Sequence, residues 1–433
     1  MVKSGYKQTE IGSLPESWDT ITFEDCFAIL PNNTLSRAEL NYNGGEVRNI
    51  HYGDILVRFP AVLDCSAEGL PYINKENVSK ASKGFLRDGD LIMADTAEDV
   101  IVGKSTEVIG IGDSKVVSGL HTIPCRPKDE EMFAPKWLGY FINHCTYHDQ
   151  LIPYITGIKV SSISKSAISS TVIAVPPKPE QEAIAEALSD IDTLIVNLEK
   201  LIAKKKAIKQ GAMQELLSGS RRLNEFKAPW KSYRVGNLGV FYSGLSGKSK
   251  GDFGCGSARY ITFMNVLANA IIDPRKLESV RVLESETQNA VKKDDLFFNT
   301  SSETPEEVGM CAVLTEHLEN TYLNSFCFGF RITNTEMSPL FLSYFFNSQE
   351  GRKIMSVLAQ GATRYNLSKT YFSDTIITVP EKDEQIAIAT ILHDMEDEIE
   401  ELHTKLAKYQ YIKHGMMSEL LIGRIRLTDK EDA

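Results

Sequence analysis

Cysteine and long apolar runs are scarce in this sequence. Its 433 residues include seven cysteines, an odd number, and none of them belongs to a C-x-x-C pair. This usage indicates a reducing compartment rather than a disulfide framework. No apolar run approaches the roughly 18 residues that a membrane-spanning helix requires, and residues 1–10 are mostly polar. We therefore expect a cytoplasmic protein without a membrane anchor.

An excess of basic residues is also missing. The formal net charge is −11, and residues 224–379 carry 16 basic and 16 acidic side chains. Net charge affects solubility and electrostatic steering, but it does not set the sign of an individual cleft. The composition neither supports nor excludes a nucleic-acid partner.

Recognisable catalytic motifs are absent as well. Gly247-Lys248-Ser249 ends like a phosphate-binding loop, but Tyr242 stands where that motif requires glycine. The stretch 252–256 resembles a cofactor-binding turn, yet a polar, glycine-rich segment precedes it where a buried strand is needed. His144 and His148 have helical spacing without the glutamate of zinc proteases. No N-P-P-[FY] or D-P-P-Y methyltransferase motif and no Pro-Asp dipeptide occurs, so we expect no catalytic residue, cofactor or metal in this chain.

An internal duplication dominates what the sequence does contain. Residues 175–223 recur at 379–427, shifted by 204 positions, and about half of the aligned residues are identical. In both copies apolar residues recur at the 3.5-residue average period of a coiled-coil seam. The residues predicted to pack the two copies together are Ile184, Leu188, Ile191, Ile195, Leu198, Ile202, Ile388, Leu392, Met395, Ile399, Leu402 and Leu406.

Each copy carries the signals of one long helix. Pro179 suits the first helical position of the first copy, and Asp383 suits the N-cap of the second. Gly219 and Gly423 suit the left-handed residue that follows a helix. A helix of about 40 residues is about 60 Å long. A lone helix would leave its apolar stripe in water, so we expect the two copies to pack on each other. Two separate amphipathic core helices are the alternative.

A globular block of mixed helix and strand precedes each helix. In the first block we predict strands at 54–57, 90–93 and 171–175 and a helix at 137–144. The second block repeats landmarks of the first: residues 261–265 parallel 50–54, 294–296 parallel 89–91, 339–347 parallel 135–143, and Gly361 parallels Gly157. Between these landmarks the two blocks hardly resemble each other, as we expect of two domains that recognise different targets.

The order of block, helix, block and helix resembles the specificity subunit of type I restriction-modification systems. So do GYKQTEIGSLPESW at the start, GLSGKSKGDFGCGSARYITFMNV in the second block, and the repeated VP…EQ.AIA..L…G.M.ELL.G..RL. The resemblance covers essentially the whole chain. It implies an α/β (mixed α+β) fold with two target-recognition domains joined by two antiparallel helices in an intramolecular coiled coil, with pseudo-two-fold symmetry.

The resemblance also implies partners. These are double-stranded DNA, two adenine-methylating subunits and, in the full complex, restriction subunits. S-adenosylmethionine would belong to the partner methyltransferase, and ATP and Mg to the restriction subunit. The predicted boundaries are 1–178 for the first recognition domain, 179–219 for the central helix, 220–382 for the second domain, and 383–433 for the C-terminal helix and tail.

Polar loops of the two blocks supply the candidate DNA contacts. Residues 361–366 form a turn with a cation, an aromatic ring and an amide, groups that hydrogen-bond phosphates and base edges. Arg364 and Lys159 follow corresponding glycines, and solvated turns are the competing interpretation for every loop. The predicted DNA-contacting residues are Asn33, Arg37, Lys159, Ser161, Lys248, Lys250, Asn299, Ser301, Arg364, Tyr365 and Asn366.

Three classes of function remain open on the sequence alone. The duplication and the resemblance favour a non-catalytic, sequence-specific DNA-binding subunit with one half-site per domain. A self-sufficient DNA methyltransferase or nuclease is opposed by the missing motifs. A coiled-coil scaffold that does not bind DNA is kept open by the acidic composition.

Overall fold

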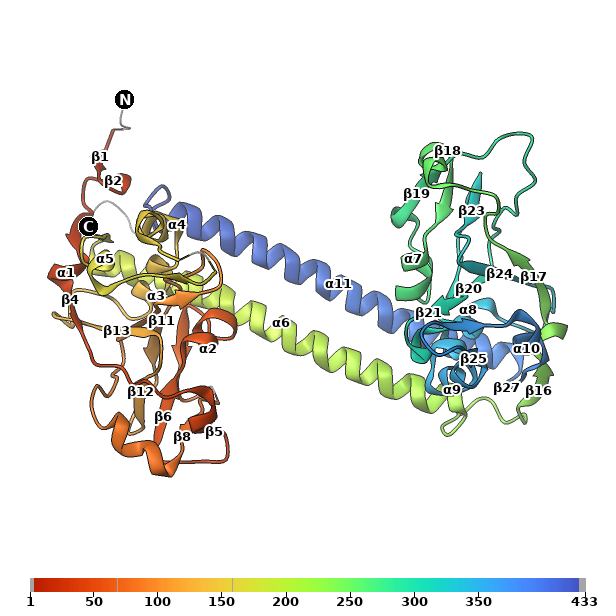
Figure 1. Cartoon of the computed structure of the whole chain (residues 1–433), viewed down its shortest axis with the longest axis horizontal. Helices are drawn as coiled ribbons and strands as arrows, with labels where there is room; N and C mark the ends of the chain where they lie inside the picture. The colour runs from red at the N-terminus through yellow and green to blue at the C-terminus, as the bar shows by residue number, and fades with distance from the viewer. Residues whose placement is uncertain (1–3, 68, 158, 428–433) are drawn as a thin grey trace. The chain divides into compact units, whose positions relative to one another are not determined.

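Two compact units make up the chain. The computed structural model describes residues 4–67, 69–157 and 159–427. Its contacts separate Met1–Glu199 with Lys405–Ala433 from Lys200–Thr404. Each unit holds one globular domain and a part of both long helices, α6 (Lys178–Ser218) and α11 (Lys382–Leu420), as Figure 1 shows. The expected mixed α/β fold, with two domains and a packed pair of long helices, is confirmed.

The first unit is built on a five-stranded sheet. Its strand order is β4-β13-β9-β11-β7, antiparallel except for the β11–β7 pair. A second sheet has the order β12-β6-β8-β5. The strands of the two sheets are β4 (Phe27–Ile29), β5 (Leu40–Asn41), β6 (Val47–Ile50), β7 (Val62–Asp64), β8 (Tyr72–Ile73), β9 (Leu91–Ala94), β11 (Ser105–Ile109), β12 (Lys115–Ser118) and β13 (Thr122–Pro127).

The second unit has a closely related plan. An antiparallel four-stranded sheet has the order β17-β24-β20-β22, and a three-stranded sheet has the order β19-β18-β23. The strands are β17 (Gly239–Ser243), β18 (Phe253–Ile261), β19 (Leu277–Val280), β20 (Asp295–Asn299), β22 (Cys311–Val313), β23 (Thr321–Leu323) and β24 (Cys327–Ile332). In both units the second sheet leads into a short helix, α2 (Tyr52–Val57) or α7 (Phe263–Ala268).

The landmarks shared by the two sequence blocks occupy matching places. Asp90 pairs with Arg126 at 2.6 Å and Asp295 pairs with Arg331 at 2.7 Å, with the aspartates almost completely buried. The short helix after the second sheet is capped by His51 in one unit and by Thr262 in the other. The repeated landmarks are therefore the residues that hold the common scaffold.

The long helices pack antiparallel within each unit. In the first unit Ile184 and Leu188 of α6 share a core with Leu420 near the end of α11. In the second unit the start of α11 shares a core with Leu216 and Leu217 of α6. Among the residues predicted to form the seam, all are buried except Met395, Leu402 and Leu406, which are partly buried. The first residues of each helix thus pack into a globular domain as well as against the other helix.

Three local predictions are corrected. Residues 54–57 belong to helix α2 and not to a strand. Their three consecutive apolar residues form a run too short to separate strand from helix by its period. The helix expected at 137–144 is present as α3 (Trp137–Ile142) but ends two residues earlier, because His144 caps a separate short helix, α4 (Cys145–His148). Asp383 lies inside the first turn of α11, not at its N-cap.

Other local predictions are confirmed. Strands β9 and β15 (Val172–Val175) lie at two of the predicted positions. Gly219, directly after α6, has φ 73°, and Gly423, shortly after α11, has φ 66°. A side chain at either glycine would also contact a tryptophan ring, Trp230 or Trp18. None of the described helices is long and apolar enough to cross a membrane.

Candidate nucleic-acid interface

Each long helix begins with a buried glutamate that is bound by an arginine following the other helix. In the first unit Glu180 accepts hydrogen bonds from Trp18 Nε1 at 2.8 Å and from Arg426 Nη2 at 2.7 Å. In the second unit Glu384 accepts two hydrogen bonds of 2.6 Å from Arg222. Removing one partner of such a buried ion pair leaves an uncompensated charge, which costs about 3–5 kcal/mol. These pairs fix both helices to both domains.

A second pair of matching contacts joins the helices further along. The hydroxyl of Tyr140 donates to Asp192 of α6 at 2.9 Å, and Asp192 pairs with Lys413 of α11 at 2.5 Å. In the second unit the hydroxyl of Tyr344 donates to Glu396 at 2.8 Å, and Lys209 of α6 pairs with that carboxylate at 3.1 Å. Burial, followed by the neighbouring carboxylate, raises the pKa of both tyrosines. Each phenol therefore stays a hydrogen-bond donor.

One buried charge distinguishes the first unit from the second. Glu107, 1% exposed, accepts hydrogen bonds from the backbone N–H groups of Lys136 at 2.5 Å and Gly139 at 2.8 Å, at the start of α3. Lys136 has φ 74°. Burial raises the pKa of Glu107 to about 7, against the lowering effect of these N–H groups. In the second unit Ser338 caps the corresponding helix, α8 (Pro339–Asn347).

The two glycine turns have the same geometry. Gly157 and Gly361 have φ 113° and 141°, and a side chain at either would collide with the carbonyl oxygen three residues ahead, Val160 or Arg364. The residue matching Arg364 is therefore Val160. The predicted correspondence of Lys159 with Arg364 is wrong by one position. Ile158, which the sequence places in the first turn, lies outside the described residues.

Several predicted DNA contacts lie on the surface of their units. Lys159, Lys250, Arg364 and Asn366 are exposed, and Ser161 and Tyr365 are partly buried. Arg37 is about half exposed, and its guanidinium makes hydrogen bonds of 2.8 and 3.0 Å to Asp54. Arg37 and Lys250 open matching 3₁₀ turns, each closed by a capping box that begins at a serine.

Four predicted contacts are inside the protein, and their assignment to DNA is withdrawn. Asn33 donates to Asn49 and the Ser118 carbonyl. Asn299, fully buried, donates to Glu307 O and accepts from Met310 N. The side chain of Lys248, 3% exposed, pairs with Glu286, and Ser301 is 4% exposed. Their polar groups bind backbone groups of the loops and other side chains. The sequence could not show this, since a polar loop residue is usually solvated.

Surface aromatic side chains beside the glycine turns were missed. Phe326 is 56% exposed and lies 5.9 Å from the Arg364 guanidinium. The side chain of His121 is 46% exposed and makes an edge contact with Tyr52 at 5.2 Å. His121 and Phe326 each precede the scaffold arginine, Arg126 or Arg331, by five residues. Aligning the blocks on those arginines would have paired the two residues.

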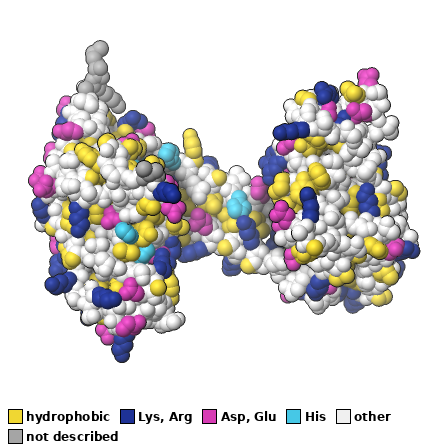
Figure 2. Space-filling model, viewed as in Figure 1, with side chains coloured by type: hydrophobic (Ala, Val, Ile, Leu, Met, Phe, Trp, Pro, Cys, Tyr) yellow, Lys and Arg dark blue, Asp and Glu magenta, His cyan; other side chains and the backbone are white. Residues whose placement is uncertain are grey.

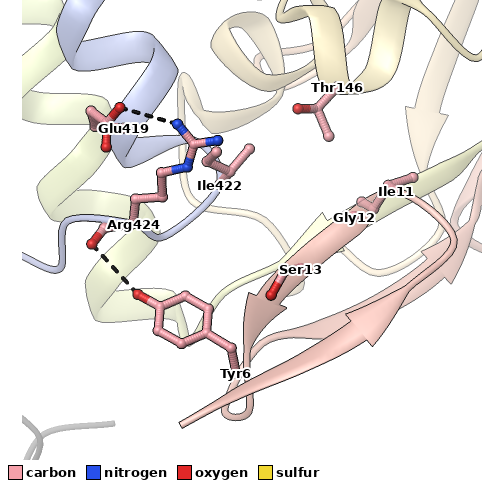
Figure 3. A pocket seen from close by; sticks show the side chains of 8 residues that line it. All are labelled: Tyr6, Ile11, Gly12, Ser13, Thr146, Glu419, Ile422 and Arg424. Carbon is pink, nitrogen blue, oxygen red and sulfur yellow. Dashed lines mark hydrogen bonds and ion pairs between the residues drawn. The ribbon is translucent and has the colours of Figure 1, made fainter. Parts of the chain in front are cut away.

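A polar cavity of about 570 Å³ lies in the first unit where the N-terminal hairpin β1–β2 (Tyr6–Thr9, Gly12–Pro15) meets the end of α11. The hydroxyl of Tyr6 donates to Gly423 O at 2.8 Å. It also lies 3.5 Å from Arg424 O, and the Arg424 guanidinium pairs with Glu419 at 3.3 Å; Figure 3 shows these two contacts of Arg424. The two charged side chains that line the cavity therefore compensate each other.

Charges of both signs are interspersed over each unit in the view of Figure 2. Most arginines near the candidate contacts are paired with carboxylates, as Arg281 is with Asp252 at 2.6 Å. Within the described part of the chain, no three His, Cys, Asp or Glu side chains are grouped so as to hold a metal ion. The face in this view therefore offers hydrogen-bonding groups and interspersed cations rather than one broad basic patch.

Both units match the model of one protein family. The family model of the type I restriction modification DNA specificity domain matches residues 15–210 and 248–408. The chain is 22% identical over 449 residues to the MjaX type I restriction enzyme specificity subunit of Methanocaldococcus jannaschii, covering 98% of this chain and 97% of that protein. It is also 22% identical to the StySPI specificity subunit of Salmonella potsdam, covering 87% and 81%.

The fold is similar to a solved structure. The crystal structure of the S subunit of the type I restriction-modification system from M. genitalium matches with a TM-score of 0.56 at 15% identity. The match covers 93% of this chain and 96% of that one. Both globular domains and both long helices of the present chain lie within a match of that extent.

Proposed function

Because the chain belongs to the family of type I restriction-modification specificity subunits, we propose that each of its units recognises one half of a split, asymmetric DNA target. The observation that carries this proposal is a common scaffold with different loops. The aspartate–arginine pairs and the glycine turns match between units, whereas the exposed residues around them differ. Two domains with a common scaffold and different surface residues can present different groups to two different base sequences.

The residues proposed to contact DNA are the accessible ones. Arg364 and Asn366 carry the side chains that pair with guanine and adenine edges, respectively. Tyr365, Lys250, Lys159, Ser161 and Arg37 remain proposed contacts to bases or phosphates. The domain boundaries proposed for these functions are 1–178 and 220–382, with the central helix at 179–219 and the C-terminal helix and tail at 383–433; residues 428–433 lie outside the described part.

The catalytic steps belong, in this proposal, to partner subunits. The chain would dock two methyltransferase subunits, which bind S-adenosylmethionine, and restriction subunits, which use ATP and Mg. Each unit contains one clasp, by which we mean a carboxylate bound by a tyrosine hydroxyl and by a lysine: Asp192 with Tyr140 and Lys413, and Glu396 with Tyr344 and Lys209. These matching contacts support two equivalent docking places.

The acidic composition predicts that specific DNA binding needs these partners. A net charge of −11 gives little nonspecific phosphate attraction, so most counterion release should come from the partner subunits. The test compares DNA binding by the chain alone and by the chain co-purified with its methyltransferase, at several salt concentrations.

We expect tight, sequence-specific binding only for the co-purified complex. Salt-sensitive, nanomolar, specific binding by the chain alone would contradict the dependence on partners. Methyl transfer by the chain alone would establish a self-sufficient enzyme instead. A stable complex that binds no specific DNA would indicate the non-DNA-binding scaffold.

A further inference from the structure

One loop has the same backbone position in both units but a different side chain at its tip. In the first unit it joins β12 to β13 and ends at His121, whose carbonyl oxygen accepts a hydrogen bond of 3.1 Å from Asp95 N. In the second it joins β23 to β24 and ends at Phe326, whose carbonyl oxygen accepts one of 2.9 Å from Thr300 N. The scaffold therefore fixes the tip and leaves its side chain free to vary.

The loop tip lies next to the glycine turn in each unit. The N–H of Asp95 binds the carbonyl of His121, and the carbonyl of Asp95 accepts a hydrogen bond of 2.9 Å from Ile163 N, just after the turn at Gly157. The carbonyl of Thr300 accepts one of 2.8 Å from Leu367 N, just after the turn at Gly361. In each unit, therefore, the residue directly after the central strand β9 or β20 binds both the loop tip and the segment that follows the glycine turn.

His121 presents an oriented imidazole. Its Nδ1 is 3.3 Å from Asp95 Oδ1 and 3.3 Å from Thr96 Oγ1, and its ring meets Tyr52 edge-on at 5.2 Å. Nε2 has no hydrogen bond within the described residues, so it can accept from a base amino group or, when protonated, donate. His121 also has φ 52°, a strained backbone state that is over-represented at functional sites.

Phe326 presents a different chemistry from the same place. Its ring is 56% exposed and lies 5.9 Å from the Arg364 guanidinium, a cation–π distance. The backbone N–H and the hydroxyl of Thr300 both donate to the carbonyl of Phe326, at 2.9 and 2.8 Å. The ring suits a thymine methyl group, and the guanidinium placed over it keeps donors for guanine O6 and N7.

We propose that the loop tip, His121 in the first unit and Phe326 in the second, is a base-contacting position that sets specificity in each half-site. This inference rests on the proposed function. A residue that distinguishes two targets must be accessible, rigidly placed and different between the two domains. Both tips meet these conditions, whereas the buried Asn33 and Asn299 do not.

The experiment uses the full chain co-purified with its methyltransferase and maps methylated adenines across host DNA. The variants are His121→Ala and Phe326→Ala. The controls are His317→Ala, an exposed histidine in the second unit, and Leu283→Ala, whose side chain is 53% exposed. We expect discrimination at one or two bases to fall by about 5- to 150-fold, the equivalent of one good base contact. His121→Ala should affect one half-site, Phe326→Ala the other, and the controls neither.

The outcomes separate this inference from the function on which it rests. A wild-type complex that methylates no two-part sequence would refute the proposed function itself. A two-part sequence that both tip variants leave unchanged, or an equal loss at every site, would overturn the inference alone. Unfolding temperatures identify a folding defect; in that case His121→Asn decides, because asparagine tolerates the left-handed backbone and its amide also accepts hydrogen bonds.

Discussion

The buried carboxyl group of Glu107 couples the stability of the first unit to pH. Its folded pKa, about 7, lies above the ordinary value of 4.5 because burial disfavours the charged form. The stability that this group contributes is therefore complete below about pH 4.5 and is lost as pH rises towards 7, by about 3 kcal/mol. We expect Glu107→Gln to abolish this dependence of the unfolding free energy on pH.

Chemical unfolding of both proteins between pH 4 and 8 measures the difference. The stability of Glu107→Gln relative to the natural chain should rise across that window, because the amide carries no charge to bury. Parallel stability curves would show that Glu107 does not titrate in this range.

Arg364 and Lys159 test the exposed contacts one residue at a time. If Arg364 contacts a base, Arg364→Ala should weaken binding at one half-site by about 1–3 kcal/mol, and Lys159→Ala should act at the other. Competition binding with half-site mutant duplexes measures this for the co-purified complex. A uniform loss for all sequences would indicate a phosphate contact, and no loss would indicate a solvated turn.

Which residues are accessible could be predicted only in part from the sequence. The glycine turn containing Arg364 was found because Gly361 repeats Gly157. Asn299 was misassigned, because an asparagine that satisfies the backbone of its own loop has the same sequence signature as one that faces DNA. His121 and Phe326 were missed because they differ, and a repeat search finds only what two blocks share.

At the scale of elements, the clasp that contains Asp192 of α6 and Lys413 of α11 should stabilise the packing of the two helices. Lys413→Asp places two carboxylates beside the Tyr140 hydroxyl and should destabilise the first unit, whereas adding Asp192→Lys should restore part of the loss. Coupling energies between contacting residues are about 0.5–3 kcal/mol. A double-mutant cycle by thermal unfolding measures the coupling. The matched pair Lys209 and Glu396 should give a similar value in the second unit, and additive effects in both would contradict the clasp.

The long helices were predictable and the short elements less so. An apolar seam that recurs in both copies, within helices of about 40 residues that are each followed by a glycine, leaves few alternatives. The segment 54–57 is helical, with His51 as its cap and Arg37 paired with Asp54. The cap is a local contact, but the ion pair joins residues 17 positions apart and depends on the fold. Asp383 lies inside α11 because Glu384, one residue on, is bound by Arg222 from beyond the other helix.

For the whole molecule, helix length should set the gap between half-sites. Inserting one heptad after Ile195 and after Ile399 preserves the seam and adds 7 residues of about 1.5 Å each, about 10.5 Å in all. That corresponds to about three base pairs, which also rotate the groove by roughly 100°. We expect lower affinity with a longer preferred gap, measured by mapping the methylated sites of the insertion complex. An active complex with its original gap would contradict this dependence.

The duplication itself was the strongest global signal in the sequence. It indicates a common ancestry of the two halves, because glycine, proline and glutamine positions of 175–223 recur at 379–427, and composition alone does not produce such a match. The target bases could not be predicted, since they depend on loops that the repeat does not share. The sequence therefore determines the scaffold of the two domains and leaves open the sequences that they recognise.

The most direct test of the two-domain account is a map of methylated adenines in DNA exposed to the natural chain with its methyltransferase. The account predicts two different short sequences separated by a fixed stretch of unspecified bases, because two domains with different surfaces share one chain. A single continuous sequence, two identical halves or a variable gap would contradict it.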